Sequence, residues 1–177
     1  MRPAAVYRAG EVRRRGVRYT LAIIGILCLA CGASPEADDA SAYVAAMQAP
    51  LRDNAAMAQR FLTSASMVKK QTTDGSKQAE ELARELAPQA DALAKAVGAI
   101  DPEAPRLDEA HALLVKAWVD RAAAYAAMRD AWSAGDLVAW DAAVKKNTQS
   151  KLDEERYFTE VNRYLAEHEF RLLQYPE

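Results

Sequence analysis

The stretch LDEAHALLVKAWVDRAAAYAAMRDAW, residues 107–132, decides the fold that the sequence predicts. Its large side chains recur at spacings of four and three residues, which places them on one face of an α-helix. The recurring positions are Leu107, His111, Leu114, Trp118, Arg121, Tyr125, Met128 and Trp132. A face of this length is typical of a helix that packs along the seam of a helical bundle.

Three further segments show the same helical period. We expect helices over about 40–70, 79–100 and 137–172 in addition to one over 105–132. Pro50 interrupts the first of them, which predicts either a kink or a separate first turn. The connecting turns are short, and short turns force neighbouring helices to run antiparallel. We therefore predict an all-α fold, an up-down antiparallel four-helix bundle that follows a cleaved signal peptide.

Composition excludes several classes of protein. Of 177 residues, 51% are hydrophobic and 27% are charged, with 7 Gly and 7 Pro, so a collagen, a low-complexity chain and a fully disordered chain are ruled out. Two cysteines cannot make a disulfide framework. Two histidines cannot build a metal site without help from carboxylates.

Polar residues interrupt the apolar face of the last predicted helix. Asn147, Lys151 and Glu154 occupy seam positions there, and Arg121 does so in the preceding helix. The pattern leaves open three interpretations: a break near residues 147–150, a polar layer inside the bundle that fixes the register of the helices, or a surface to which helical drift turns these residues.

The N-terminal 30 residues have the composition of a secretory signal. Six arginines and a single acid precede an uncharged run, Leu21 to Ala30. At about 1.5 Å per residue, this run covers roughly half of a bilayer core that requires about 20 residues, so it is too short to span a membrane as a helix. We predict a signal peptide over residues 1–30.

The end of that run, Cys28-Leu29-Ala30-Cys31, resembles the lipobox of bacterial lipoproteins. The resemblance implies that Cys31 becomes the lipidated first residue of the mature chain, with ordinary cleavage after Ala30 or Ala33 as the alternative. Cys28 departs from the leucine that the family usually has. Gly32 follows Cys31, and in Gram-negative lipoproteins the absence of Asp there implies the outer membrane.

Tyr43 leads the first predicted helix, and the turn Asp101-Pro102-Glu103-Ala104-Pro105 leads into the alanine-rich helix that begins at Leu107. With the lipobox, this pattern resembles small helical bacterial lipoproteins of uncharacterised function over most of the mature chain.

The mature chain is acidic. Removing six arginines and one glutamate from 23 bases and 25 acids leaves 17 and 24, a net charge near −7. Such a charge repels nucleic acid, so we expect no nucleic-acid partner, and membrane attachment would have to come from the acyl chains. Residues 31–39 have the polarity of a tether, and 40–177 form the predicted helical domain.

Three side chains are candidate ligands for a metal ion or another small ligand. His111 lies on a seam, Asp108 stands one helical turn before it, and His168 falls late in the last helix, where antiparallel packing brings it to a similar height. Metal-carboxylate bundles use repeated Glu-x-x-His pairs, and this sequence has none. We therefore expect a hydrogen-bonded His111 and a solvated His168, with no metal and no cofactor.

Other motifs carry no function in this context. Asp108-Glu109-Ala110-His111 spells a helicase box, but the phosphate-binding loop that such an enzyme needs is missing. Cys28 and Cys31 have redox-motif spacing but lie in the apolar run of the signal. No nucleophile elbow or reactive cysteine remains in the mature chain, so we predict that the protein is not an enzyme.

These observations lead to two functional hypotheses. The first is an outer-membrane lipoprotein, a non-enzymatic module that binds another envelope protein through an exposed aromatic patch. The patch would consist of Tyr157, Tyr164, Phe170 and Tyr175. The alternative is a periplasmic bundle that binds a metal ion, haem or small apolar molecule, with an alanine-lined cavity beside His111 and Trp118.

Overall fold

The computed structural model describes residues 34–69 and 75–174, and every regular element in these ranges is helical. The elements are α1 (Pro35–Lys69), α2 (Gly75–Glu81), the π-helical turn η1 (Leu82–Leu86), α3 (Ala87–Gly98), α4 (Pro105–Ala134) and α5 (Leu137–Ala166). Because α2, η1 and α3 follow one another without a break, the described chain has four helical rods. The prediction of an all-α fold with four helices is confirmed.

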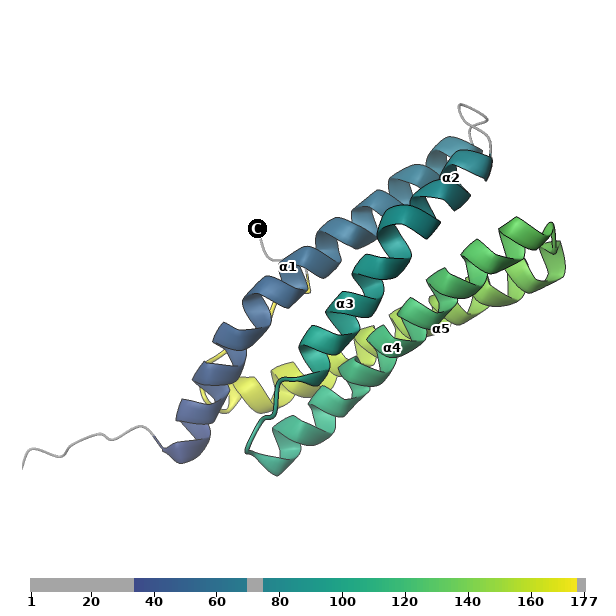
Figure 1. Ribbon diagram of the computed structural model, residues 1–177. Helices are drawn as coiled ribbons and strands as arrows, with labels where there is room; N and C mark the ends of the chain where they lie inside the picture. The colour runs from purple at the N-terminus through teal and green to yellow at the C-terminus, as the bar shows by residue number, and fades with distance from the viewer. Residues whose placement is uncertain (1–33, 70–74, 175–177) are drawn as a thin grey trace, which may run out of the picture. The chain divides into compact units, whose positions relative to one another are not determined.

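Successive rods reverse direction, as Figure 1 shows. Helix α4 packs most extensively on α5 and next on α3. We call the end where α1 and α4 begin and α5 ends the near end, and the end where α2 and α5 begin and α4 ends the far end. At the far end Gly75 lies so close to the Trp132 ring that a Cβ atom on residue 75 would stand 2.2 Å from it.

The beginning of α1 corrects the predicted tether. Residues 35–39 belong to the helix, because Ser34 and Pro35 form a helix start: the Ser34 hydroxyl accepts from the Ala37 N–H at 3.2 Å, and proline suits a first turn. Asp39 is one of the acidic residues in the predicted tether. Its carboxylate accepts from the N–H groups of Glu103 and Ala104 at 3.2 and 2.9 Å. This contact holds the start of α1 beside the start of α4.

Prolines shape the first two rods differently. Helix α1 continues through Pro50, so residues 39–48 are not a separate turn. Before Pro88 the chain forms the π-helical turn, in which the Ala87 N–H reaches back five residues to the Leu82 carbonyl. Proline has no N–H to give to the preceding turn, and the wider π turn accommodates this loss.

The last helix is unbroken where polar residues interrupt its apolar face, and it ends earlier than predicted. Asn147 lies in its interior, which excludes a break at residues 147–150. The helix ends at Ala166 and not near residue 172. After it, Glu169 adopts a left-handed φ of 65° and the Phe170 N–H bonds to the Leu165 carbonyl at 2.9 Å. In the turn between α4 and α5, Gly135 adopts a φ of 68°, and the Asp136 carboxylate caps α5 by accepting from the Ala139 N–H.

The core is made of small side chains and a few large ones. The largest fully buried side chains include Trp118, Tyr125 and Tyr157, with alanines from α3, α4 and α5 between them. Phe61 stacks on Tyr125 with ring centroids 5.0 Å apart. Because alanine buries little area, these aromatic contacts contribute a large share of the apolar stabilisation.

The predicted signal peptide, with Cys28 and Cys31, lies outside the described residues. Among the helices of the described ranges, none is long and apolar enough to cross a bilayer.

Candidate functional site

His111 is at the centre of a hydrogen-bond chain that joins all four rods. Its Nδ1 atom lies 2.9 Å from the hydroxyl of Tyr43 in α1, and its Nε2 atom lies 3.0 Å from the carbonyl oxygen of Val97 in α3. The Tyr43 hydroxyl also lies 2.9 Å from that of Tyr157 in α5. All three side chains are buried. We call Tyr43, His111 and Tyr157 the tyrosine–histidine chain.

The carbonyl oxygen of Val97 sets the direction of these bonds. A carbonyl can only accept, so Nε2 of His111 carries the proton and donates it to Val97. Nδ1 of the neutral ring then accepts from Tyr43, which accepts from Tyr157. Burial lowers the pKa of His111 below its usual value and raises the pKa of both tyrosines. The neutral ring is therefore the stable form.

The structure does not assemble the candidate ligand set. Both ring nitrogens of His111 are occupied by protein atoms, and Asp108 is exposed in the first turn of α4. His168 is half-buried after α5, with its ring centroid 4.9 Å from that of Tyr164. Across residues 34–69 and 75–174, no group of three His, Cys, Asp or Glu side chains is placed to hold a metal ion. The geometry thus does not support the metal-site hypothesis for these residues.

A buried ion pair joins α4 to α5, and its Glu154 lies three residues before Tyr157 on α5. Arg121 Nη2 lies 2.6 Å from Glu154 Oε2, and both side chains are buried. The other carboxylate oxygen, Oε1, accepts from Asn54 in α1 at 2.9 Å and from the Trp118 indole at 2.8 Å. Arg121 Nη1 also donates to Asn54 Oδ1 at 2.7 Å. We call these four residues the charged cluster.

Around the charged cluster, two polar atoms have no hydrogen-bond partner: Nε of Arg121 and Oδ1 of the buried Asn147. Lys151 is half-buried, its ammonium nitrogen 5.7 Å from the centroid of the Phe61 ring, and burial lowers its pKa. Of the polar seam residues that the sequence singles out, Arg121, Asn147 and Glu154 are therefore inside the bundle and Lys151 lies at its edge.

Two members of these networks were missed by sequence reasoning. Asn54 stands three residues after Leu51 on the buried face of α1, so its spacing signalled its burial, but a single polar residue does not indicate its partner. Tyr43 was noticed only as the aromatic residue at the start of a helix.

The charged cluster can fix the relative positions of α1, α4 and α5. Its carboxylate accepts hydrogen bonds from three donors and is closed to solvent.

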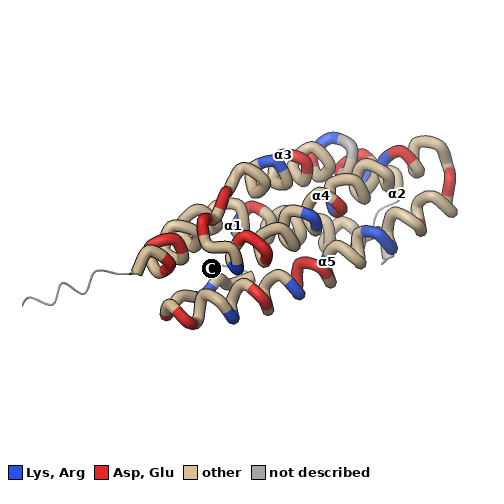
Figure 2. The backbone as a smooth tube through the Cα atoms, turned by 90° about the horizontal axis from the view of Figure 1, so that it is seen from below, with Lys and Arg blue, Asp and Glu red and all other residues tan. Residues whose placement is uncertain are grey.

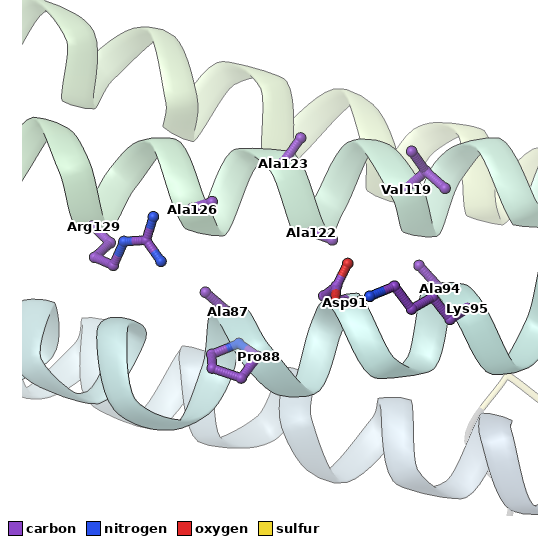
Figure 3. Close-up of a pocket in the computed structure, with 10 residues that line it drawn as sticks. All are labelled: Ala87, Pro88, Asp91, Ala94, Lys95, Val119, Ala122, Ala123, Ala126 and Arg129. Carbon is purple, nitrogen blue, oxygen red and sulfur yellow. Dashed lines mark hydrogen bonds and ion pairs between the residues drawn. The ribbon is translucent and has the colours of Figure 1, made fainter.

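An open groove lies between α3 and α4, and Figure 3 shows the side chains that line it. The groove has a volume of about 590 Å³. Alanines line much of it, Val119 and Arg129 border it from α4, and Lys95 pairs with Asp91 on the α3 side at 2.7 Å. Neither His111 nor the tryptophan of the charged cluster lines this groove. This groove is therefore a different site from the alanine-lined cavity that the sequence predicts beside those residues.

An apolar patch lies at the far end of the α4–α5 hairpin. Leu137 is 70% exposed and Val138 is 81% exposed, in the first turn of α5. Trp132 and Val144 are also exposed, and the Trp132 ring packs at 5.7 Å against that of the half-buried Trp140. We call these five residues the far-end patch. Exposed apolar side chains that gather in this way are characteristic of binding surfaces.

The aromatic patch expected near the C-terminus is wrong. Tyr157 and Tyr164 are buried, and Phe170 is half-buried, because each packs into the core or against it. Tyr175 lies outside the described residues. A helical stripe of aromatic residues signals burial as readily as exposure, and here it faces inward.

Comparison with known proteins gives no match: no family model, no curated protein and no solved structure is similar to this chain. Function must therefore be argued from the residues themselves.

We expect Glu154→Gln to lower the free energy of unfolding by about 3–5 kcal/mol, since it leaves the Arg121 guanidinium buried without its counter-charge. The double variant Arg121→Met/Glu154→Gln should recover part of this loss, because no charge then stays buried and the glutamine amide oxygen can still accept from Asn54 and Trp118. Urea unfolding measures all three chains. Glu155→Gln, on the exposed neighbouring position, is the control and should stay within about 0.5 kcal/mol of wild type. A Glu154→Gln chain as stable as this control would contradict the prediction.

The buried neutral His111 predicts that stability falls in mild acid. Below a pH of about 6.5 the unfolded chain binds a proton at this ring, whereas the folded chain, whose His111 pKa is lowered, resists it. The loss is at most about 1.4 kcal/mol per pH unit down to the folded pKa. Urea unfolding between pH 7.5 and 5 should show a shallower pH dependence for His111→Gln than for wild type. His168→Gln is the control; if both variants keep the wild-type slope, the prediction fails.

Proposed function

We propose that the protein is a lipid-anchored, non-enzymatic interaction module of the bacterial envelope. In this proposal residues 1–30 are removed as a signal peptide and Cys31 carries the acyl chains. Gly32 directs the mature protein to the outer membrane, and the up-down bundle binds another envelope protein. The lipobox-like sequence at Cys28 to Cys31 supports the anchor. The far-end patch supports the interaction, and it is the observation that carries the proposal.

The position of the far-end patch suits a module anchored at its other end. Cys31 stands four peptide steps before Pro35, so it lies within about 14 Å of the start of α1. Asp39 binds the backbone at the start of α4, which has 30 residues and therefore a length of about 45 Å. The patch at the other end of α4 is therefore about 45 Å along the bundle from the start of α1, and an apolar protein surface is the partner that it fits.

The surface charge supports a protein partner over nucleic acid. Figure 2 shows acidic and basic positions interspersed along the helices. Many of the basic side chains form surface ion pairs with acids, such as Arg106 with Glu167 at 2.7 Å and Lys116 with Asp120 at 2.7 Å. A basic stripe of the kind that binds phosphate backbones would need cations that are not neutralised in this way.

The groove between α3 and α4 favours a second candidate function, the binding of a small apolar molecule. Its volume of about 590 Å³ is within the range of ligand pockets, and alanines and Val119 provide an apolar lining. Its openness to solvent, visible in Figure 3, makes this the weaker candidate, since binding pockets usually enclose most of the ligand. A metal analysis and an absorption spectrum of protein purified from its own envelope separate a metal or haem protein from the interaction module.

The anchor is tested by growth with radiolabelled palmitate. We expect the wild-type chain and Cys28→Ser to incorporate the label and Cys31→Ser to lose it, because only the cysteine at the cleavage position receives acyl chains. A control lipoprotein in the same cells verifies labelling. A wild-type chain that stays unlabelled beside a labelled control contradicts the proposal.

The interaction is tested by photocrosslinking in the native envelope. A photoreactive residue in place of Val138 should give one adduct of defined mass with an envelope protein, because this side chain is the most exposed of the far-end patch. Leu152, which is 52% exposed on the same helix but outside the patch, is the matched control and should give no such adduct. Equal adducts from both positions, or none from Val138, would exclude the patch as the partner's binding surface.

A further inference from the structure

After α5 the chain turns at residues 167–169 and continues to residue 174 without helical structure. We call residues 167–174 the C-terminal segment. Leu172 is 2% exposed and belongs to the hydrophobic core, whereas the next residue, Leu173, is 51% exposed. Leu172 and Leu173 border a small cavity of about 110 Å³ together with Gln48 and Leu51 of α1. The Leu172 side chain thus fixes the end of this segment beside α1, and the half-buried Phe170 packs against the core before it.

The backbone of Leu172 is recognised by the side chain of Asn162. The Asn162 amide nitrogen donates to the Leu172 carbonyl oxygen at 3.0 Å, and the Asn162 amide oxygen accepts from the Leu172 N–H at 2.8 Å. An amide that pairs with both backbone groups of one residue reads an extended chain without regard to its sequence, as a neighbouring strand does. The adjacent apolar site then selects the side chain. These are the two elements of a peptide-binding site.

Beyond the turn, the segment is held by the two Asn162 bonds and by the side chains of Phe170 and Leu172. The hinge before these contacts is Glu169, which adopts a φ of 65°, a conformation that residues other than glycine disfavour. Beside the segment lies a groove of about 580 Å³, lined by Phe158, Phe170 and Arg171 among others, so the segment leaves open volume along α5. A ligand that fills more of this groove would bind better than the segment does.

We propose that the Asn162 site is a peptide-binding site that the chain's own segment 167–174 occupies, and that an extended, leucine-bearing peptide of a partner protein replaces this segment. The proposal rests on the proposed interaction function and names the chemistry of one partner. The partner peptide presents a free backbone N–H and C=O to Asn162 and places one leucine beside Leu51. Because the segment is tethered, it competes at a high effective concentration and sets a threshold for binding.

The test changes the hinge of the full-length chain and leaves the site itself intact. Proline cannot adopt the φ of Glu169, so Glu169→Pro should release the segment, whereas Glu169→Gly relieves the strain and should hold it more firmly. A fluorescein-labelled peptide with the sequence EHEFRLLQ, residues 167–174, is titrated against each chain by anisotropy. We expect Glu169→Pro to bind it at least tenfold more tightly than wild type, and Glu169→Gly to bind it more weakly than wild type.

Matched leucines in the peptide control for specificity. Against the Glu169→Pro chain, replacement of the leucine at position 172 by alanine should abolish binding, whereas the same replacement at position 173 should change it less than threefold. Asn162→Ala in the Glu169→Pro chain should also abolish binding. Equal affinity of wild type and Glu169→Pro, or equal loss from both leucine replacements, would overturn the proposal.

Two further measurements cover the remaining outcomes. If Glu169→Pro does not fold by circular dichroism, hydrogen exchange in the wild-type chain decides: the Leu172 N–H should exchange far faster than that of Val161 through local opening, and exchange at the same rate would overturn the proposal. If the Glu169→Pro chain dimerises without peptide, the occupant is a second copy and the assignment to a foreign peptide is wrong. Palmitate labelling and crosslinking at Val138 test the proposed function independently of these results.

Discussion

The ion pair between Arg121 and Glu154 is the constraint on which the rest of the structure depends. Each charge is buried in a bundle whose core is largely alanine, and neither can leave the other without a large cost in desolvation. Since Asn54 and Trp118 bind the same carboxylate, the pair fixes α1 as well as α4 and α5 at one height. Small side chains permit many registers of nearly equal energy, and a geometrically demanding polar contact selects one of them.

The tyrosine–histidine chain performs the same task closer to the near end and adds α3. Two further polar contacts lie at that end. The carboxylate of Asp39 in α1 accepts from the backbone at the start of α4, and Arg106 makes a bidentate contact with Glu167. The far end is held differently, by Trp132 on Gly75 and on Trp140. The polar near end and the apolar far end are therefore distinct in chemistry.

Much of the fold could be predicted from the sequence because the helical period is visible in it. The seam from Leu107 to Trp132, the turn at Gly135 and the cap at Asp136 needed only local patterns. Helix ends were less predictable: Ser34 and Pro35 start a helix with residues that also suit a tether, and the reversal at Glu169 has no glycine to announce it. Burial of Arg121 and Glu154 was one of several open interpretations, and their pairing with Asn54 depends on contacts 67 and 100 residues apart, which no local pattern contains.

The hydrogen bonds from Tyr157 through Tyr43 to His111 all point one way, because the last acceptor is a main-chain oxygen. Each hydroxyl has one hydrogen to donate. The Val97 carbonyl oxygen in α3 therefore determines the direction in which the Tyr157 hydroxyl of α5 donates. The bundle thus has a polarity across its width, perpendicular to the dipoles of its helices. An added proton on Nδ1 would reverse the two bonds that the hydroxyl groups make, while Nε2 would still donate to Val97. The hydroxyl hydrogen of Tyr157 would then need a new acceptor.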